Sequence, residues 1–199
     1  MIGVIDYEAG NITSVCNALQ SVGTKYFVSN DKTRLEQANK IIMPGVGEAQ
    51  SAMTSLRGLD LVDWLRNVRV PFLGICLGMQ VLFERSEERD TDCLGIVSGT
   101  ISRFKQNGSS GSLKIPHMGW NTVSPDTNHV LFTHIPAGSY FYFVHSYYAP
   151  VVTETVSRTG YGIEFTSALQ KDNFYGVQFH PEKSGKYGLQ ILKNFIELC

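Results

Sequence analysis

The chain of 199 residues lacks the features that define several large classes of protein. It has no apolar run long enough to cross a bilayer, and its first residues lack the basic and apolar regions of a signal peptide. Its net charge of −1 includes no basic block, which argues against binding to nucleic acid or to an anionic membrane. We therefore expect a cytoplasmic protein with no nucleic-acid partner and no membrane association.

Cysteine is also scarce, and the cysteines present have no paired spacing. A disulfide framework or a zinc site is therefore not expected, and a reducing compartment is indicated. The chain carries no phosphate-binding loop and no dinucleotide fingerprint. We expect no organic cofactor and no metal. The four cysteines are Cys16, Cys76, Cys93 and Cys199.

Short apolar segments alternate with segments of helical periodicity in the first half of the chain. Strands are expected at 1–5, 25–28, 41–43 and 72–75, and helices at 11–22, 31–38 and about 56–68. This alternation indicates a parallel sheet, whose ligand sites form at the carboxyl ends of the strands. Later come a polar loop at 105–112, strand-like segments at 140–144, 162–169 and 174–179, and a final helix at about 187–198. No linker divides the chain, so we expect a single α/β domain over 1–199.

Residues 71–80 (PFLGICLGMQ) are the most informative segment. An apolar run ends at Cys76, which has Gly74 and Gly78 as its second neighbours, and a helix-compatible segment, 79–85, follows. A strand–turn–helix elbow of this kind would present the thiol as a nucleophile at a helix N-terminus, where the macrodipole favours a thiolate. A buried, unreactive cysteine is the alternative for this motif alone.

A histidine and a carboxylate follow the strand-like segment 174–179. His180 would act as the base for a thiol, and Glu182 would hold the imidazole in one tautomer. A surface turn is the alternative for this motif alone, but together with Cys76 it completes a Cys-His-Glu set. The loop 44–47 (PGVG) is a candidate oxyanion loop, with the amide of Leu77 as a second donor; a plain tight turn is the alternative there.

The elbow at 74–80 and the HPE motif at 180–182 resemble the class I (triad) glutamine amidotransferases. The segments 6–11, 44–47, 116–121, 142–147 and 180–184 are similar, within that family, to the glutaminase subunits of imidazole glycerol phosphate synthase, an enzyme of histidine biosynthesis. The resemblance implies a flavodoxin-like three-layer sandwich. Its central sheet would be mostly parallel, with extra antiparallel strands in the C-terminal half.

The resemblance also implies roles for individual residues. Cys76 would attack the carboxamide of L-glutamine to form a γ-glutamyl thioester, His180 would transfer the proton, and Glu182 would orient His180. Gly47 and Leu77 would form the oxyanion hole. Glu84 is a weaker candidate for holding the amino group of glutamine. The substrate-binding residues implied are Gly45, Gln80, His145, Ser146 and Tyr147.

A partner protein is the last implication of the resemblance. The family passes ammonia to a (β/α)₈ cyclase subunit, which makes imidazole glycerol phosphate and aminoimidazole carboxamide ribonucleotide; the two subunits form a heterodimer. The absence of an acceptor domain in this chain agrees with that arrangement. Core packing is the alternative for Met118 and Trp120. The interface positions implied are Asn11, Met118, Trp120, Tyr142 and Lys183.

Three other functions remain open at this point. A related amidotransferase that feeds another synthase, such as one aminating a surface sugar, would have the same triad. A γ-glutamyl hydrolase would act alone on peptides, and Gln80 and the segment 116–121 argue against it. A non-catalytic binding subunit would not need an intact Cys76, His180 and Glu182.

Overall fold

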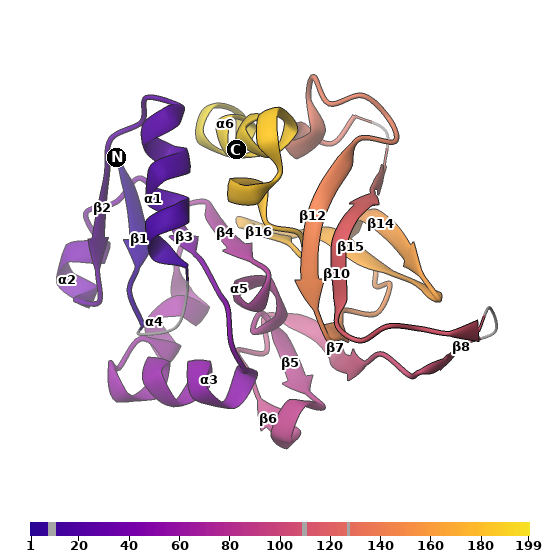
Figure 1. The fold of residues 1–199 in the computed structure, drawn as a ribbon. Coiled ribbons are helices and arrows are strands. Elements are labelled where there is room, and N and C mark those ends of the chain that lie inside the picture. Colours follow the sequence, from indigo (N-terminus) through magenta and orange to yellow (C-terminus); the bar gives the residue numbers. More distant parts are fainter. Residues whose placement is uncertain (8–10, 109–110, 127) are drawn as a thin grey trace.

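The computed structural model describes residues 1–7, 11–108, 111–126 and 128–199 (Figure 1). An eight-stranded sheet runs through the centre in the order β11-β14-β15-β16-β4-β3-β1-β2. The strands from β16 to β2 are parallel, whereas β11, β14 and β15 are antiparallel additions. Their bounds are β1 (Ile2–Ile5), β2 (Tyr26–Ser29), β3 (Lys40–Met43), β4 (Phe72–Ile75), β11 (Ser124–Pro125), β14 (Thr155–Tyr161), β15 (Ile163–Lys171) and β16 (Phe174–Val177).

Helices cover both faces of this sheet and make the three layers expected from the sequence (Figure 1). Alternate residues of a strand point to opposite faces. In β3, Ile42 therefore joins the apolar core under α1 (Ile12–Ser21) and α6 (Gly185–Leu198). Ile41 and Met43 join the other core, under α2 (Lys32–Leu35), α3 (Ala49–Gly58) and α4 (Val62–Asn67). The predicted fold class is confirmed.

Smaller sheets extend from the central one. The strands β13, β7, β5 and β6 form a four-stranded sheet, and β10 pairs antiparallel with β12. The remaining elements are α5 (Leu77–Gln80), β5 (Phe83–Ser86), η1 (Glu88–Asp90), β6 (Thr91–Asp92), β7 (Val97–Arg103), β8 (Asn107–Gly108), β9 (Gly111–Ser112), β10 (His117–Thr122), η2 (Val130–Phe132), β12 (Tyr140–His145), β13 (Tyr147–Tyr148) and η3 (Pro181–Lys183). Within the described residues, no helix has the length and apolarity needed to cross a membrane.

Three local predictions were wrong. The helix expected at 79–85 is only the four residues of α5, because the buried Phe83 pairs with Val97 in β5 and long-range pairing outweighs local propensity. The helix expected at 56–68 is two helices, and Asp60 lies between them with a positive φ of 55°. The loop expected at 105–112 contains the paired strands β8 and β9, while residues 109–110 lie outside the described residues.

Candidate active site

Cys76 lies at the apex of a strained turn between β4 and α5. Its backbone has φ 53° and ψ −107°, a conformation that non-glycine residues rarely adopt and that costs about 1–3 kcal/mol. The turn is held on both sides: the Cys76 N–H donates to Val177 O at 2.7 Å, and the Cys76 carbonyl accepts from Met79 N and Gln80 N at 3.0 and 3.1 Å. The sequence prediction of a nucleophile elbow therefore agrees with the observed backbone.

The glycines of the elbow are required by close packing. A Cβ added at Gly78 would lie 2.1 Å from the carbonyl oxygen of Met43, at the end of β3. We expect Gly78→Ala to destabilise the protein by about 1–3 kcal/mol, because the backbone would have to move, and to lower glutaminase activity with it. Thermal unfolding measures this effect. Gly58→Ala is the matched control, since a Cβ at Gly58 meets nothing within 4 Å; equal melting temperatures for the two variants would contradict the packing argument.

The sheet topology brings the predicted histidine to this elbow. β4 and β16 are parallel neighbours, with Ile75 opposite Val177, so the residues that follow both strands emerge at one edge. The His180 N–H donates to Tyr142 O of β12 at 2.9 Å, and His180 Nδ1 lies 2.8 Å from Glu182 Oε1. Both side chains are 1% exposed. Cys76, His180 and Glu182 therefore form one buried cluster.

The charges within this cluster support one another. Burial by itself lowers the pKa of His180, but the neighbouring Cys76 thiolate and the Glu182 carboxylate outweigh burial and raise that pKa. Nδ1 is held by Glu182, and Nε2 is buried without a hydrogen-bond partner among the described residues. Nε2 is thus the atom left to exchange a proton with the thiol, as an imidazolium–thiolate pair requires.

A cavity of about 310 Å³ opens in front of the thiol. Seven predicted site residues line it together, whereas Gly45 packs behind the elbow, where an added Cβ would lie 2.6 Å from Gly78 N. Gly47 adopts φ +102°, which favours glycine. The lining residues are Val46, Gly47, Cys76, Leu77, Gln80, Glu88, Pro116, Val144, His145, Ser146 and Tyr147.

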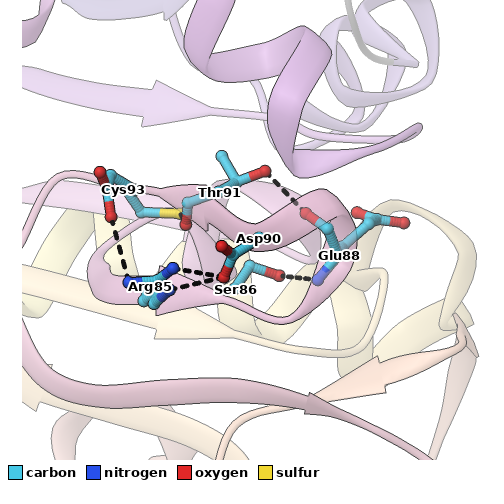
Figure 2. Close-up of polar contacts among 7 residues, drawn as sticks. Arg85, Ser86, Glu88, Asp90, Thr91 and Cys93 are labelled. Atoms are coloured by element: carbon cyan, nitrogen blue, oxygen red, sulfur yellow. Dashed lines mark hydrogen bonds and ion pairs between the residues drawn. The ribbon is translucent and has the colours of Figure 1, made fainter.

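Glu88 is a lining residue that the sequence analysis missed. The weaker candidate, Glu84, is exposed, and its carboxylate accepts from Gly99 N at 3.1 Å instead. Figure 2 shows how the turn around Glu88 is held: the Glu88 N–H donates to Ser86 Oγ, and the Thr91 hydroxyl donates to Glu88 O. Burial raises the pKa of Glu88, although an N–H from Ala49 partly offsets this. The run of acidic residues at 84–90 offered no local signal to single it out.

A directed chain of hydrogen bonds lines the wall of the cavity beside His145. The Tyr147 carbonyl accepts from His145 Nδ1 at 2.7 Å, so His145 Nε2 is the acceptor for His117 Nδ1 at 3.0 Å. His117 Nε2 in turn accepts from Asn121 Nδ2 at 3.2 Å. Burial lowers the pKa of His117 to about 4 and that of His145 to about 3, so both rings are neutral near pH 7.

The predicted interface residues lie on one face beside the site. Met118 and Trp120 of β10 are 63% and 56% exposed, so neither packs in the core. The Trp120 ring contacts the ring of Tyr142 edge to face, and Lys183 Nζ lies 6.0 Å from the Tyr142 ring centroid. Asn11 precedes α1, which packs against η3. Residues 8–10, part of the predicted motif 6–11, lie outside the described residues.

The fold and this cluster define an enzyme with a Cys-His-Glu triad. The family model for glutamine amidotransferase class-I matches residues 3–198, so the chain belongs to the class I glutamine amidotransferase family.

Proteins named imidazole glycerol phosphate synthase subunit HisH are similar to this chain over nearly its whole length. The one from Bacteroides thetaiotaomicron is 46% identical and the match covers 99% of each chain; the one from Salmonella typhimurium is 46% identical with 98% coverage of each. A crystal structure titled glutamine amidotransferase is similar in fold, with a TM-score of 0.75 at 17% identity over 99% of this chain and 97% of that one. The crystal structure of a putative GMP synthase protein from Thermoplasma acidophilum has a TM-score of 0.72 at 20% identity, over 98% of this chain and 91% of that one.

Proposed function

We propose that this chain is the glutaminase subunit of an imidazole glycerol phosphate synthase, which hydrolyses L-glutamine to glutamate and ammonia for histidine biosynthesis. The observation that carries the proposal is the strained Cys76 elbow beside the buried His180–Glu182 pair. The 46% identity to HisH subunits over nearly the full length selects this synthase over others of the family. It also disfavours the surface-sugar amidotransferase and the stand-alone hydrolase.

The geometry supports a thioester mechanism. The Cys76 thiolate attacks the side-chain carboxamide carbon of glutamine, and the amide N–H groups of Leu77 and Gly47 stabilise the oxyanion that forms. His180 Nε2 gives its proton to the departing ammonia, leaving a γ-glutamyl thioester on Cys76. His180 then takes a proton from water, which attacks the thioester and releases glutamate. Glu182 keeps the proton of Nδ1 in place throughout.

The cavity in front of Cys76 offers groups for the other end of glutamine. The Glu88 carboxylate accepts from Ala49 N through Oε2, which leaves Oε1 as the oxygen for an α-ammonium group. Gln80, Ser146 and Tyr147 line the same cavity and would complete the binding of the α-amino and carboxylate groups. His145, through its bond to Tyr147 O, positions this wall rather than donating that nitrogen to substrate.

A partner subunit that receives ammonia is also part of the proposal. Met118, Trp120 and Tyr140 are large apolar side chains exposed on the paired strands β10 and β12, and such aromatic side chains are typical anchors of protein interfaces. The strands carry this surface next to His145 and His180, so a (β/α)₈ cyclase docked there would lie close to the site that releases ammonia.

Glutamate release from glutamine tests the proposal, measured with and without the cognate cyclase and its nucleotide ligand. We expect low activity alone and a strong rise in the complex. Trp120→Ala should weaken the activation at least about tenfold, because anchor truncations cost about 2 kcal/mol or more. Trp64→Ala is the control, since Trp64 lies on α4 at the other face of the sheet. Strong activity without partner, or silence in every mixture, would contradict the proposal.

A further inference from the structure

Gln178 lies fully buried beside the nucleophile and has no role in the function described so far. It follows β16 directly, and because Ile75 pairs with Val177, it lies alongside Cys76 at the same sheet edge. Its backbone N–H donates to Ser167 O at 2.9 Å, and its side chain is 0% exposed. Gln178 Nε2 lies 3.5 Å from Cys76 Sγ. A buried amide in contact with a reacting sulfur needs a physical explanation.

The orientation of the Gln178 amide follows from its neighbours. Gln80 Nε2 lies 2.9 Å from the carbonyl oxygen of Tyr147, which can only accept, so this end of Gln80 is its NH₂ group. The same NH₂ lies 2.8 Å from the Gln178 amide, whose facing atom must therefore be the acceptor Oε1. The NH₂ group of Gln178 is consequently turned toward the sulfur. A backbone carbonyl thus sets the direction of two successive amides.

We propose that Gln178 stabilises the reactive form of Cys76 by donating an N–H to its sulfur, and that Gln80 holds Gln178 in the orientation needed to do so. A thiolate accepts a hydrogen bond better than a thiol, so a fixed donor favours the ionised nucleophile. The inference rests on the proposed function, because it assigns Cys76 as the nucleophile of that reaction.

The other groups around the sulfur leave this task to Gln178. His180 is the charged neighbour, but it must release its proton during each turnover. Tyr7, at the end of β1, donates its hydroxyl to Pro44 O, and burial raises its pKa, so it remains neutral. His145 is neutral and donates to Tyr147 O, while Glu182 acts on the sulfur only through His180. Gln178 is a neutral donor that holds the sulfur while His180 moves the proton.

The pH dependence of Cys76 alkylation by iodoacetamide tests the proposal in the full chain, with the Cys76 peptide followed by mass spectrometry. In Gln178→Met we expect the midpoint of the rate profile to rise by about one pH unit, a tenfold change in the thiolate equilibrium. Gln170→Met is the matched control: this amide lies in the same sheet, bonded to His129 and Tyr175, and its loss should leave the profile in place. A Gln178→Met profile that coincides with that of the wild type would overturn the proposal.

A measurement on the unaltered protein covers the case in which Gln178→Met does not fold. The side-chain amide resonances of Gln178 should shift with pH at the midpoint of Cys76 alkylation, and those of Gln170 should not; a Gln178 signal that ignores the thiol would refute the inference. Cys76→Ala separates this inference from the function. If Cys76→Ala abolishes glutamate release while the Gln178 measurements are negative, only the inference fails. If Cys76→Ala keeps full activity, the proposed function fails as well.

Discussion

Replacing Cys76 with alanine should lower glutamate release in the complex with the cyclase by roughly 10⁴-fold or more, because the covalent route is then lost. His180→Ala should cost about as much, since the thiol would lose its proton acceptor. The two changes should not add: the double variant should be hardly slower than either single one, because each residue works only through the other. Steady-state glutamate release, with saturating glutamine, measures all three.

The buried position of the triad requires a control for folding. His180 and Glu182 are both 1% exposed, so thermal unfolding of each variant must accompany the rates. His134→Ala serves as the comparison for the histidine change, because His134 is exposed and far along the chain from the triad. If the losses in the double variant multiplied, Cys76 and His180 would be acting independently, and the triad assignment would be wrong.

Acidification should destabilise the free chain strongly between pH 6.5 and 4. Burial lowers the pKa of His117 to about 4 and that of His145 to about 3, whereas both should titrate near 6.5 when unfolded. In this window the unfolded chain binds more protons, so the stability present above pH 6.5 is lost as the pH falls. His117 alone accounts for about 3 kcal/mol by pH 4. The physical cause is that a proton on either ring would set two N–H groups against each other.

Urea unfolding at a series of pH values measures this loss. His117→Gln should make the curve of unfolding free energy against pH clearly shallower, while His134→Gln should leave its slope unchanged. His129, whose pKa burial also lowers, contributes equally in all three proteins. His180 does not add to the loss well below pH 6.5, because its raised pKa keeps it protonated in the folded state too. Constant stability of the wild type from pH 7 to 4.5 would contradict the prediction.

Local signals in the sequence predicted much of the site correctly because they depend on neighbouring residues. The glycines around Cys76 mark a turn with no room for a Cβ, and the observed 2.1 Å approach at Gly78 is the physical basis of that signal. The alternation of short apolar strands with amphipathic helices likewise predicted the parallel sheet. The helix expected at 79–85 failed because Phe83 pairs with Val97, fourteen residues further on, and no local pattern encodes that pairing.

The sequence by itself determined the strand–turn–helix elbow, the presence of all three triad residues and the two-faced α/β architecture, since each follows from short-range periodicity and turn chemistry. Only the tertiary structure decided that Cys76 meets His180, because that contact requires β4 and β16 to be parallel neighbours in register. It also decided that Glu88 rather than Glu84 lines the cavity, and that Gln178 and His145 carry directed hydrogen bonds. These roles depend on distances between segments far apart in the chain, which residue spacing alone does not contain.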